Sequence, residues 1–207
     1  MIVDIHDDLY KQLSNDNPLL FDLWIPTSRV IVIGYSQKAE EEVHVDRCRR
    51  DGLPVVKRKG GGGAVLLMPG MLCITSAFFS TLSESPDYFF KCINRFLCSF
   101  LTEFYHIRNL SLRGISDIAI GDKKILGCSI FKSRTTVFYQ GSLLVNPDLE
   151  AVGYYLRHPS REPDYRRGRR HVDFLTSLEK CGYEISPTDL HARLFREMES
   201  RFESAVR

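Results

Sequence analysis

The residues of this chain best suited to chemistry begin with a run of four glycines, Gly60 to Gly63, directly after the cations Lys57-Arg58-Lys59. Glycine costs stability wherever the backbone is ordered, so a run of them needs a reason. Exposed N–H groups in such a turn form a nest for an anion, and the preceding cations favour phosphate. The loop lies between two strand-like runs and opens no helix, so it is neither a Walker A loop nor a dinucleotide fingerprint. The alternative is a flexible hairpin with charged flanks, although a two-residue turn explains fewer glycines than this.

A second candidate is the lysine pair Lys123-Lys124, which follows the turn Gly121-Asp122 in a strand that otherwise reads as buried. Strict alternation places Lys124 and Leu126 on one face of the strand, and Lys123 with Ile125 on the other. Either ammonium can lie on a wet face or point into a site, and spacing alone leaves both interpretations open.

The strand-like run 138–144 is a third candidate, because Gly141 interrupts it. Glycine inside a strand marks a bulge or a close approach by a ligand or by another stretch of backbone. The run therefore belongs among the candidate sites.

The fourth candidate is the segment 165–171, which reads Tyr-Arg-Arg-Gly-Arg-Arg-His. Its arginines cannot share a small face without mutual repulsion, so they need anions. Guanidinium groups bind phosphate in a bidentate manner, which makes phosphate the natural partner, and nucleic acid is another. A solvated loop paired with nearby acids is an equally good interpretation, because charge runs are usually that. Those acids are Glu162, Asp164 and Asp173.

The elements that position these residues follow from periodicity. Apolar residues recur at intervals of three and four over 86–104, which predicts a helix capped by Ser85. A second long helix begins at Ser186-Pro187, with proline at its first position. Shorter helices are predicted at 4–13, 43–51 and 149–156, and strands at 19–25, 29–33, 53–58, 64–68, 71–79, 115–120, 123–132 and 135–145.

Strands dominate the middle of the chain, and helices do not alternate with them strictly. This order predicts an α+β fold with a mixed, mostly antiparallel β-sheet flanked by helices. The turn residues Pro26-Thr27-Ser28 predict a hairpin between the first two strands. No linker or repeat interrupts the chain, so residues 1–207 are expected to form a single domain.

Composition excludes several classes of protein. The chain has 207 residues, of which 43% are hydrophobic, and a net charge of +2, which is too close to zero to predict a partner. No stretch of about 18 apolar residues is present, so no membrane span is expected. The acidic N-terminus is unlike a signal peptide. The six cysteines are scattered without metal-ligand spacing, and they read as buried thiols of a reducing, cytoplasmic compartment.

Taken in this order, the motifs resemble those of the lipoate-protein ligase A family, within the biotin and lipoate protein ligase superfamily. The resemblance covers about residues 20–180 and depends above all on the glycine run together with the lysine motif. The matching segments are Val32 to Gln37, Lys57 to Val65, Ser116-Asp117, Gly121 to Cys128 and Gln140 to Leu144.

The resemblance implies a fold shared with biotin ligases and class II aminoacyl-tRNA synthetases. It also implies that the chain uses ATP, Mg²⁺ and lipoate or octanoate. The carboxylate would attack the α-phosphorus of ATP, giving an acyl-adenylate and pyrophosphate. The acyl group would then pass to a lysine of an acceptor, either a lipoyl domain or an H-protein-like protein. The implied activity is that of an ATP-dependent lipoate-protein ligase.

Roles for single residues follow from the same resemblance. Lys124 matches the family's active-site lysine, whose cation would bridge the acyl carbonyl and the α-phosphate and offset charge in both steps. Asp117 would face the nucleotide or Mg²⁺. The other residues implied to bind lipoyl-AMP or ATP are Arg58, Gly61, Gly62, Gly63, Ala64, Gln140, Gly141 and Ser142, and the candidates for a loop that closes over phosphate are Arg167, Arg169 and Arg170.

The chain also departs from the family pattern. Gln140 stands where the family has histidine, Phe131 where an arginine is often found, and Lys59 and Gly60 precede the triple glycine in place of small residues. The separate C-terminal domain of some members has no counterpart here. Since that domain assists adenylation, a separate accessory subunit is a further expectation.

Two alternatives to the ligase remain. One is a transferase that takes octanoyl or lipoyl groups from a pre-activated donor. Relatives that act through a thioester place a cysteine just before the lysine strand or far downstream of it, and the region before the strand here, residues 110–116, has none. Cys128 shares a strand face with Lys124 by alternation and is interpreted as a packing residue. The other alternative is a non-catalytic module that binds acyl-nucleotide or nucleic acid, with nucleic acid the less favoured because only the arginine segment supports it.

Overall fold

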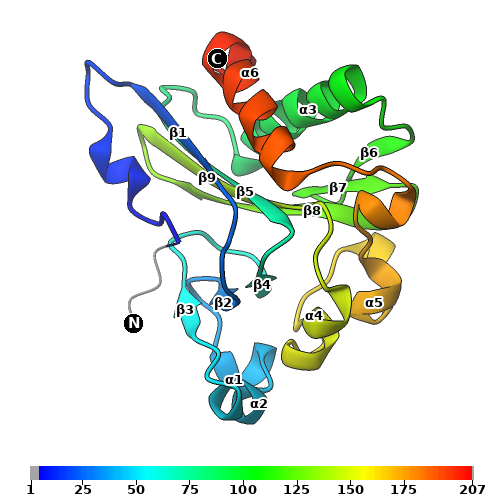
Figure 1. The fold of residues 1–207 in the computed structure, drawn as a ribbon. Coiled ribbons are helices and arrows are strands. Elements are labelled where there is room, and N and C mark those ends of the chain that lie inside the picture. Colours follow the sequence, from blue (N-terminus) through cyan, green and yellow to red (C-terminus); the bar gives the residue numbers. More distant parts are fainter. Residues whose placement is uncertain (1–4, 207) are drawn as a thin grey trace.

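Two β-sheets and the helices around them make up the fold of residues 5–206, the part of the chain that this computed structural model describes (Figure 1). The larger sheet has six strands in the order β1-β5-β9-β8-β7-β6, and the smaller has three in the order β3-β2-β4. The strands are β1 (Leu19–Trp24), β2 (Val30–Ile33), β3 (Val55–Lys57), β4 (Val65–Leu67), β5 (Met71–Phe79), β6 (Leu110–Arg113), β7 (Asp117–Ile120), β8 (Lys123–Lys132) and β9 (Thr136–Leu144).

Strand directions confirm the predicted fold class. Every neighbouring pair in the six-stranded sheet is antiparallel. In the smaller sheet β2 runs parallel to β3 and antiparallel to β4. The molecule is therefore an α+β protein whose sheets are mixed and mostly antiparallel.

The predicted hairpin of the first two strands is wrong. β1 pairs with β5, from Leu19 opposite Phe78 to Trp24 opposite Cys73. β2 instead lies in the smaller sheet, between β3 and β4. The turn residues 26–28 predict that the chain changes direction, but they carry no information on which distant strand completes each ladder. For the same reason the glycine run does not close a hairpin, because β2 separates the strands on either side of it.

Two long helices cover one face of the six-stranded sheet. They are α3 (Pro86–Tyr105) and α6 (Pro187–Val206), which lie side by side in Figure 1. The apolar stripe predicted for α3 is confirmed, since Phe89, Ile93 and Phe100 are each at most 1% exposed. The ring centroids of Phe96 and Phe202 lie 5.5 Å apart across the two helices. Ser85 does occupy the N-cap position of α3, although its side chain makes no capping hydrogen bond.

The other face of that sheet carries the smaller sheet and the short helices. A second apolar cluster joins Ile31 and Leu66 of the smaller sheet to Cys73 and Leu144 of the larger one. The short helices are α1 (Ala39–Glu42), α2 (Val45–Arg50), α4 (Leu149–Tyr155) and α5 (His171–Phe174), with 3-10 turns at Leu9–Gln12, Asp164–Arg166 and Glu179–Cys181. Of these, α1 and α5, like strand β6, were not predicted, because four-residue elements show no periodicity. Within residues 5–206 no helix is long and apolar enough to cross a membrane.

Candidate active site

A cavity of about 790 Å³ opens between the two sheets, on the face of the larger sheet that α3 and α6 leave uncovered. Its floor is formed by side chains of β5, β8 and β9 that alternate with those packed under the long helices. Its rim is formed by the glycine run and by the loop that follows α4. The polar residues that line it include Arg58, Thr75, Asp117, Lys124, Gln140, Ser142, Arg161, Arg166 and His171.

Lys124 and Asp117 form an ion pair at the floor of this cavity. The Nζ atom of Lys124 lies 2.8 Å from Oδ1 of Asp117, and the two side chains are 25% and 6% exposed. The phenol of Tyr165 donates a hydrogen bond of 2.8 Å to Oδ2 of the same carboxylate. Burial, followed by the charge of Asp117, raises the pKa of Tyr165, so the phenol remains a donor at neutral pH. Asp117 thus fixes the position of the ammonium group of Lys124 at the cavity.

A β-bulge turns Lys124 toward the cavity. Ile118 is opposite Leu126, whereas the next residue, Ala119, is opposite Lys124, so Ile125 is an extra residue in β8. A bulge of this kind re-aims the side chains on one side of it. Ile125 and Leu126 are both 0% exposed in the core under α3. The strict alternation that placed Lys124 with Leu126 is therefore wrong.

The backbone at the bulge is held from two directions. β8 pairs with β9 only from Leu126 onward, whereas Lys124 forms a bridge with Leu175, which follows α5. The carbonyl of Lys124 accepts a hydrogen bond of 3.0 Å from the N–H of Thr176. Residues 175 and 176, which follow the arginine-rich segment, therefore hold the backbone of Lys124 in β8.

Gly127 gives the lysine its space. A Cβ atom built on Gly127 would lie 2.4 Å from Nζ of Lys124, so any side chain there would displace the ammonium. Gly127 was not among the predicted site residues, although it lies in the lysine motif, three residues after Lys124. That short spacing from a candidate lysine is the signal that points to it.

Arg58 shapes the glycine run. Its guanidinium is 7% exposed and donates hydrogen bonds of 2.6 Å to the carbonyl of Gly61 and 2.8 Å to that of Gly63. Burial lowers the pKa of Arg58 to about 10, which leaves it charged at neutral pH. The charge of this arginine is therefore directed at the loop's own carbonyls.

The cavity wall beside Arg58 is backbone. Gly62, Gly63 and Ala64 line the cavity, whereas Gly61 does not. Gly62 has a φ of +89°, a conformation that favours glycine. A Cβ atom on Gly34 would lie 2.3 Å from the carbonyl oxygen of Gly62, so the earlier Gly34 motif packs directly beneath the loop. The glycine run is thus an ordered wall.

Strand β9 divides its residues between the two faces of the sheet. Ser142 is 9% exposed and lines the cavity. Gln140 also lines it, donates a hydrogen bond of 3.2 Å to the carbonyl of Ile5, and has a buried Oε1 with no partner among the described residues. A Cβ atom on Gly141 would lie 2.7 Å from the phenol oxygen of Tyr139. Packing on the helix side therefore explains why position 141 is glycine.

The arginine-rich segment contributes different residues from those predicted. Arg169 pairs with Asp122 at 2.9 Å, and Arg170 pairs with Asp173 at 2.8 Å. Arg167 is exposed, and none of these three lines the cavity. Their acids are local, as the solvated-loop interpretation expected, except that Asp122 comes from the turn before β8. The structure does not bring Arg167, Arg169 or Arg170 together with Lys124.

Two other arginines do line the cavity. Arg166 is 5% exposed, lies 3.4 Å from Glu162, and has a buried Nη2 without a partner among residues 5–206. Burial lowers its pKa. Arg161 is exposed and makes no hydrogen bond or ion pair with another described residue. Arg166 lies in the candidate segment 165–171 but was not given a role of its own. Arg161 was not predicted, and its only signal was the polar composition of residues 157–171.

His171 adds a neutral imidazole to the same wall. Burial, followed by the charges of Arg166, His158 and Lys124, lowers its pKa to about 4. The cations Arg166 and Lys124 therefore lie near an uncharged histidine, and this wall suits an anionic ligand. The acidic residues that also line the cavity are Glu41, Glu42, Asp117, Glu162 and Asp164.

Cys128 is among the residues that line the cavity with Lys124, but its thiol is hydrogen-bonded to other groups of the protein. Its Sγ donates a hydrogen bond of 2.8 Å to the carbonyl of Ser116 and lies 3.5 Å from the amide of Asn94 on α3. Burial raises the pKa of this thiol to about 12. Cys128 is therefore a protonated packing residue at neutral pH, as the interpretation of the sequence proposed.

The described residues do not fit a metal site built by the protein. No group of three histidine, cysteine or acidic side chains within residues 5–206 could hold an ion. Asp117, the predicted Mg²⁺ ligand, already engages Lys124 through Oδ1 and Tyr165 through Oδ2. A carboxylate neutralised by an ammonium is a poor ligand for a cation, so Asp117 is better suited to orient Lys124 than to hold a metal.

Known proteins resemble this chain over almost its whole length. Residues 3–199 match the family described as the lipoyl protein ligase A/B catalytic domain. The lipoate-protein ligase A of Blochmanniella floridana is 32% identical over 167 residues, which cover 77% of this chain and 46% of that protein. The lipoate–protein ligase 1 of Plasmodium falciparum is 26% identical over 209 residues, 98% of this chain and 48% of the relative. The chain thus spans about half the length of these curated relatives.

Solved structures show the same fold. A bipartite lipoate protein ligase from Thermoplasma acidophilum, studied with its E2 lipoyl domain, superposes with a TM-score of 0.81 at 20% identity, covering 95% of this chain and 76% of that one. A lipoate-protein ligase A bound with ATP superposes with a TM-score of 0.74 at 23% identity, covering 95% and 78%. At these identities the likeness concerns the fold.

Proposed function

The chain belongs to the family of lipoyl protein ligase A/B catalytic domains, and from this premise we propose that it is an ATP-dependent lipoate-protein ligase. It joins lipoate, or octanoate, to AMP and then transfers the acyl group to a lysine of an acceptor, a lipoyl domain or an H-protein-like protein. One observation carries the proposal: Lys124, matched to the family's active-site lysine, lies on a bulge in a large cavity and is held there by Asp117.

In the first step a carboxylate oxygen of lipoate attacks the α-phosphorus of ATP. The bond from this phosphorus to the oxygen that leads to the β-phosphate breaks, and pyrophosphate leaves with the electron pair. Negative charge builds on the phosphoryl oxygens, where a preorganised cation is worth far more than it is in water. Lys124 supplies that cation, and its ion pair with Asp117 fixes its direction.

In the second step the neutral amine of the acceptor lysine attacks the acyl carbon. The bond between this carbon and the AMP oxygen breaks, AMP leaves with the electron pair, and the new amide nitrogen loses a proton. Charge now builds on the carbonyl oxygen, so the same ammonium of Lys124 can stabilise both transition states.

The two ends of the cavity suit the two parts of the adenylate. Apolar side chains at one end would receive the acyl chain, and they include Trp24, Leu66, Met71 and Cys73. The backbone of Gly62, Gly63 and Ala64 passes close enough for the adenylate to lie against it. Arg161 and Arg166 take the phosphate role that was predicted for Arg167, Arg169 and Arg170, because among the arginines of residues 157–171 only these two line the cavity.

The proposal extends to the domain organisation, the metal ion, an accessory subunit and the cellular compartment. The described residues form one catalytic domain, since a single apolar cluster joins the two sheets. Mg²⁺ would enter bound to the phosphates of ATP and would offset their charge. A separate accessory subunit would assist adenylation. The protein acts in the cytoplasm, where its six free cysteines stay reduced.

The test is a reconstituted reaction. Purified protein with ATP, Mg²⁺ and lipoate should catalyse exchange of radioactive pyrophosphate into ATP, and an unmodified lipoyl domain should gain the mass of one lipoyl group. Lys124→Ala should lower both rates by about 10²–10³-fold, the typical effect of removing one preorganised donor. Lys123→Ala is the matched control, because this neighbour is exposed and lies outside the cavity.

The outcomes separate the alternatives. Full activity of Lys124→Ala would remove this lysine from the mechanism. Acceptor acylation from synthetic lipoyl-AMP, without any pyrophosphate exchange, would identify a transferase that uses a pre-activated donor. Transfer through a thioester on Cys128 is disfavoured, because burial keeps that thiol protonated.

A further inference from the structure

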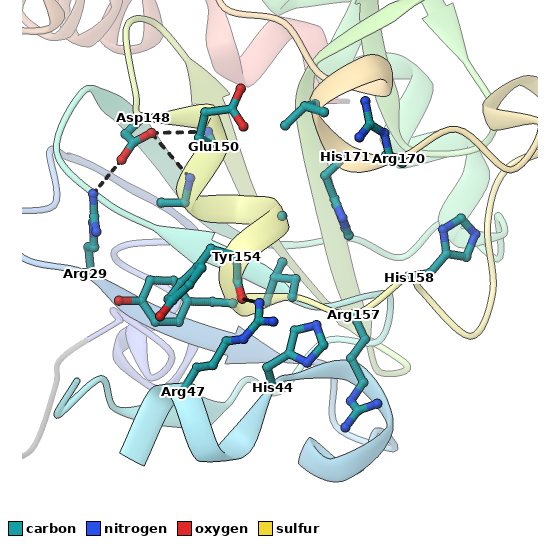
Figure 2. Close-up of a pocket in the computed structure, with 15 residues that line it drawn as sticks. Arg29, His44, Arg47, Asp148, Glu150, Tyr154, Arg157, His158, Arg170 and His171 are labelled. Carbon is teal, nitrogen blue, oxygen red and sulfur yellow. Dashed lines mark hydrogen bonds and ion pairs between the residues drawn. The ribbon is translucent and has the colours of Figure 1, made fainter. Parts of the chain in front are cut away.

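A second cavity, of about 750 Å³, lies outside the proposed active site (Figure 2). We call it the arginine cleft and define it by Arg29, His44, Arg47, Arg157 and Arg170. It opens between α2, α4 and α5. Leu156 and His171 line both cavities, so these two side chains form part of the wall between them.

Two cations of the arginine cleft lack acidic partners. Arg47 donates a hydrogen bond of 2.6 Å to the carbonyl of Tyr154, and Arg157 donates one of 3.0 Å to the carbonyl of Val43. Neither makes an ion pair with a described residue. Arg29 and Arg170 differ, because each pairs with an aspartate at 2.8 Å. The positive charge of the cleft that no ion pair compensates therefore comes from Arg47 and Arg157. Glu150, which also makes no ion pair with a described residue, lines the same cleft.

His44 lies with these two arginines on one wall of the arginine cleft, as Figure 2 shows. Its pKa is lowered by burial and then by the charges of Arg47 and Arg157. The histidine is thus neutral at pH 7 and does not add to the charge. An anion bound here would satisfy both guanidinium groups and would also stabilise the protonated form of His44.

The cleft suits separate carboxylates better than a continuous chain of phosphates. Asp148 and Glu150 line the same cavity as the arginines, and a nucleic-acid backbone crossing it would meet both. Discrete acidic side chains on a protein surface can contact Arg47 and Arg157 without approaching these acids. The net charge of the whole chain is only +2, so the protein has no general attraction for polyanions.

We propose that the arginine cleft docks acidic side chains of the acceptor protein, close to the lysine that becomes acylated. The proposal rests on the proposed function, because it assumes that an acceptor lysine enters the neighbouring cavity. Charge complementarity of this kind at an interface mainly speeds association and orients the partner. The arginine cleft would thus orient the acceptor, while Lys124 and its neighbours perform the chemistry.

The first experiment measures acceptor acylation by Arg47→Gln/Arg157→Gln, with an unmodified lipoyl domain of acidic surface as the probe. Glutamine removes each charge and keeps an N–H donor for the carbonyl. We expect the KM for the acceptor to rise about fivefold, as for charges at the rim of an interface, while pyrophosphate exchange, which needs no acceptor, stays unchanged. The matched control is Arg49→Gln, on the same helix but outside the cleft and paired with Asp46.

A second measurement does not depend on activity or on the variant. Hexaglutamate peptide is titrated into the unmodified protein, and the pKa of His44 is followed by NMR. Binding in the arginine cleft should raise that pKa toward its ordinary value, and 0.5 M NaCl should abolish the effect because salt screens exposed charges. An adventitious contact elsewhere would leave His44 unmoved.

Each outcome decides something. An unchanged acceptor KM in a folded double variant would overturn the proposal, as would a peptide that leaves His44 unchanged. An RNA oligonucleotide that binds more tightly than the peptide, through the same two arginines, would also overturn it and identify a nucleic-acid surface. Absence of pyrophosphate exchange in the unmodified protein would count against the proposed function, and the peptide titration would still decide whether the cleft binds carboxylates.

Discussion

The two faces of the six-stranded sheet are made from the same strands and have opposite characters. Toward α3 and α6 the strands present Ile74 and Tyr139, both at most 1% exposed within a continuous apolar cluster. Toward the cavity the same strands present Thr75, Gln140 and Ser142. The helix face holds the molecule together, and the cavity face gathers the groups that would do chemistry.

This comparison shows that neighbouring residues of one strand can serve different purposes. On β9, Tyr139 donates a hydrogen bond of 3.0 Å to Asn94 of α3, whereas Gln140 lines the cavity. β8 shows the exception, because its bulge moves Lys124 from the helix face to the cavity face. Substitutions on the helix face should therefore change stability, and those on the cavity face should change activity.

The largest expected effect is on the helix face. Phe100→Ala removes a ring of α3 that is 1% exposed, and large-to-small changes of this kind lower the free energy of unfolding by about 3–5 kcal/mol. Urea unfolding followed by circular dichroism measures the change. Phe195→Ala is the control, since that ring is 37% exposed and should cost much less. The fraction that stays folded should keep its rate of pyrophosphate exchange, and a specific loss of activity would break the distinction between the faces.

The next effect is on the cavity face. Gly127→Ala places a methyl group where Nζ of Lys124 now lies, and the flexible lysine will move aside at little cost in stability. Its ammonium then leaves the reacting atoms, so the rate of adenylate formation should fall by about 10²–10³-fold. Pyrophosphate exchange and thermal melting are compared with those of Ser111→Ala, on edge strand β6 outside the cavity. A large fall in melting temperature with retained activity would contradict the separation of roles.

A smaller effect is a pH dependence that belongs to the cavity wall. Folding lowers the pKa of His171 to about 4 from an ordinary value of 6.5. As pH falls below about 6.5, His171 is protonated in the unfolded chain but stays neutral in the folded protein. The free energy of unfolding therefore falls progressively down to pH 4, by about 1–3 kcal/mol.

Urea unfolding at pH 7 and pH 4.5 tests this prediction. The loss between the two pH values should be smaller in His171→Gln than in the unmodified protein. His106→Asn, which removes an exposed imidazole outside the cavity, should leave the loss unchanged. An equal loss in all three proteins would show that His171 is not responsible.

The smallest effect is expected at the boundary between the faces. Cys128→Ser keeps a donor for the carbonyl of Ser116, so the free energy of unfolding should fall by about 1 kcal/mol or less. Both the exchange and acylation rates should stay within about twofold, in line with the small effect of a retained hydrogen bond. Loss of acylation with exchange intact would instead restore a catalytic thiol.

Much of this architecture was predictable from the sequence. The stripe from Phe89 to Phe104 repeats at helical spacing, and the strand-like runs of the middle region indicated a mostly antiparallel sheet. The lysine motif and the glycine run together indicated the family. The charged segment 165–171 was less predictable, because its composition fits both a phosphate loop and a surface loop. Only its neighbours in space, such as Asp122 for Arg169, distinguish the two.

The sequence by itself determined most of the helices and strands, because element type follows from local periodicity in all but the shortest segments. It also singled out Lys124 as the candidate lysine, because that residue lies in a recognisable motif. The tertiary structure decided which strands pair and which charged side chains face the cavity. β1 and β2 separate into two sheets, the bulge at Ile125 redirects Lys124, and Arg161 and Arg166 replace their neighbours at the cavity. Each of these three features depends on contacts between residues far apart in the chain, and the local spacing of residues does not predict such contacts.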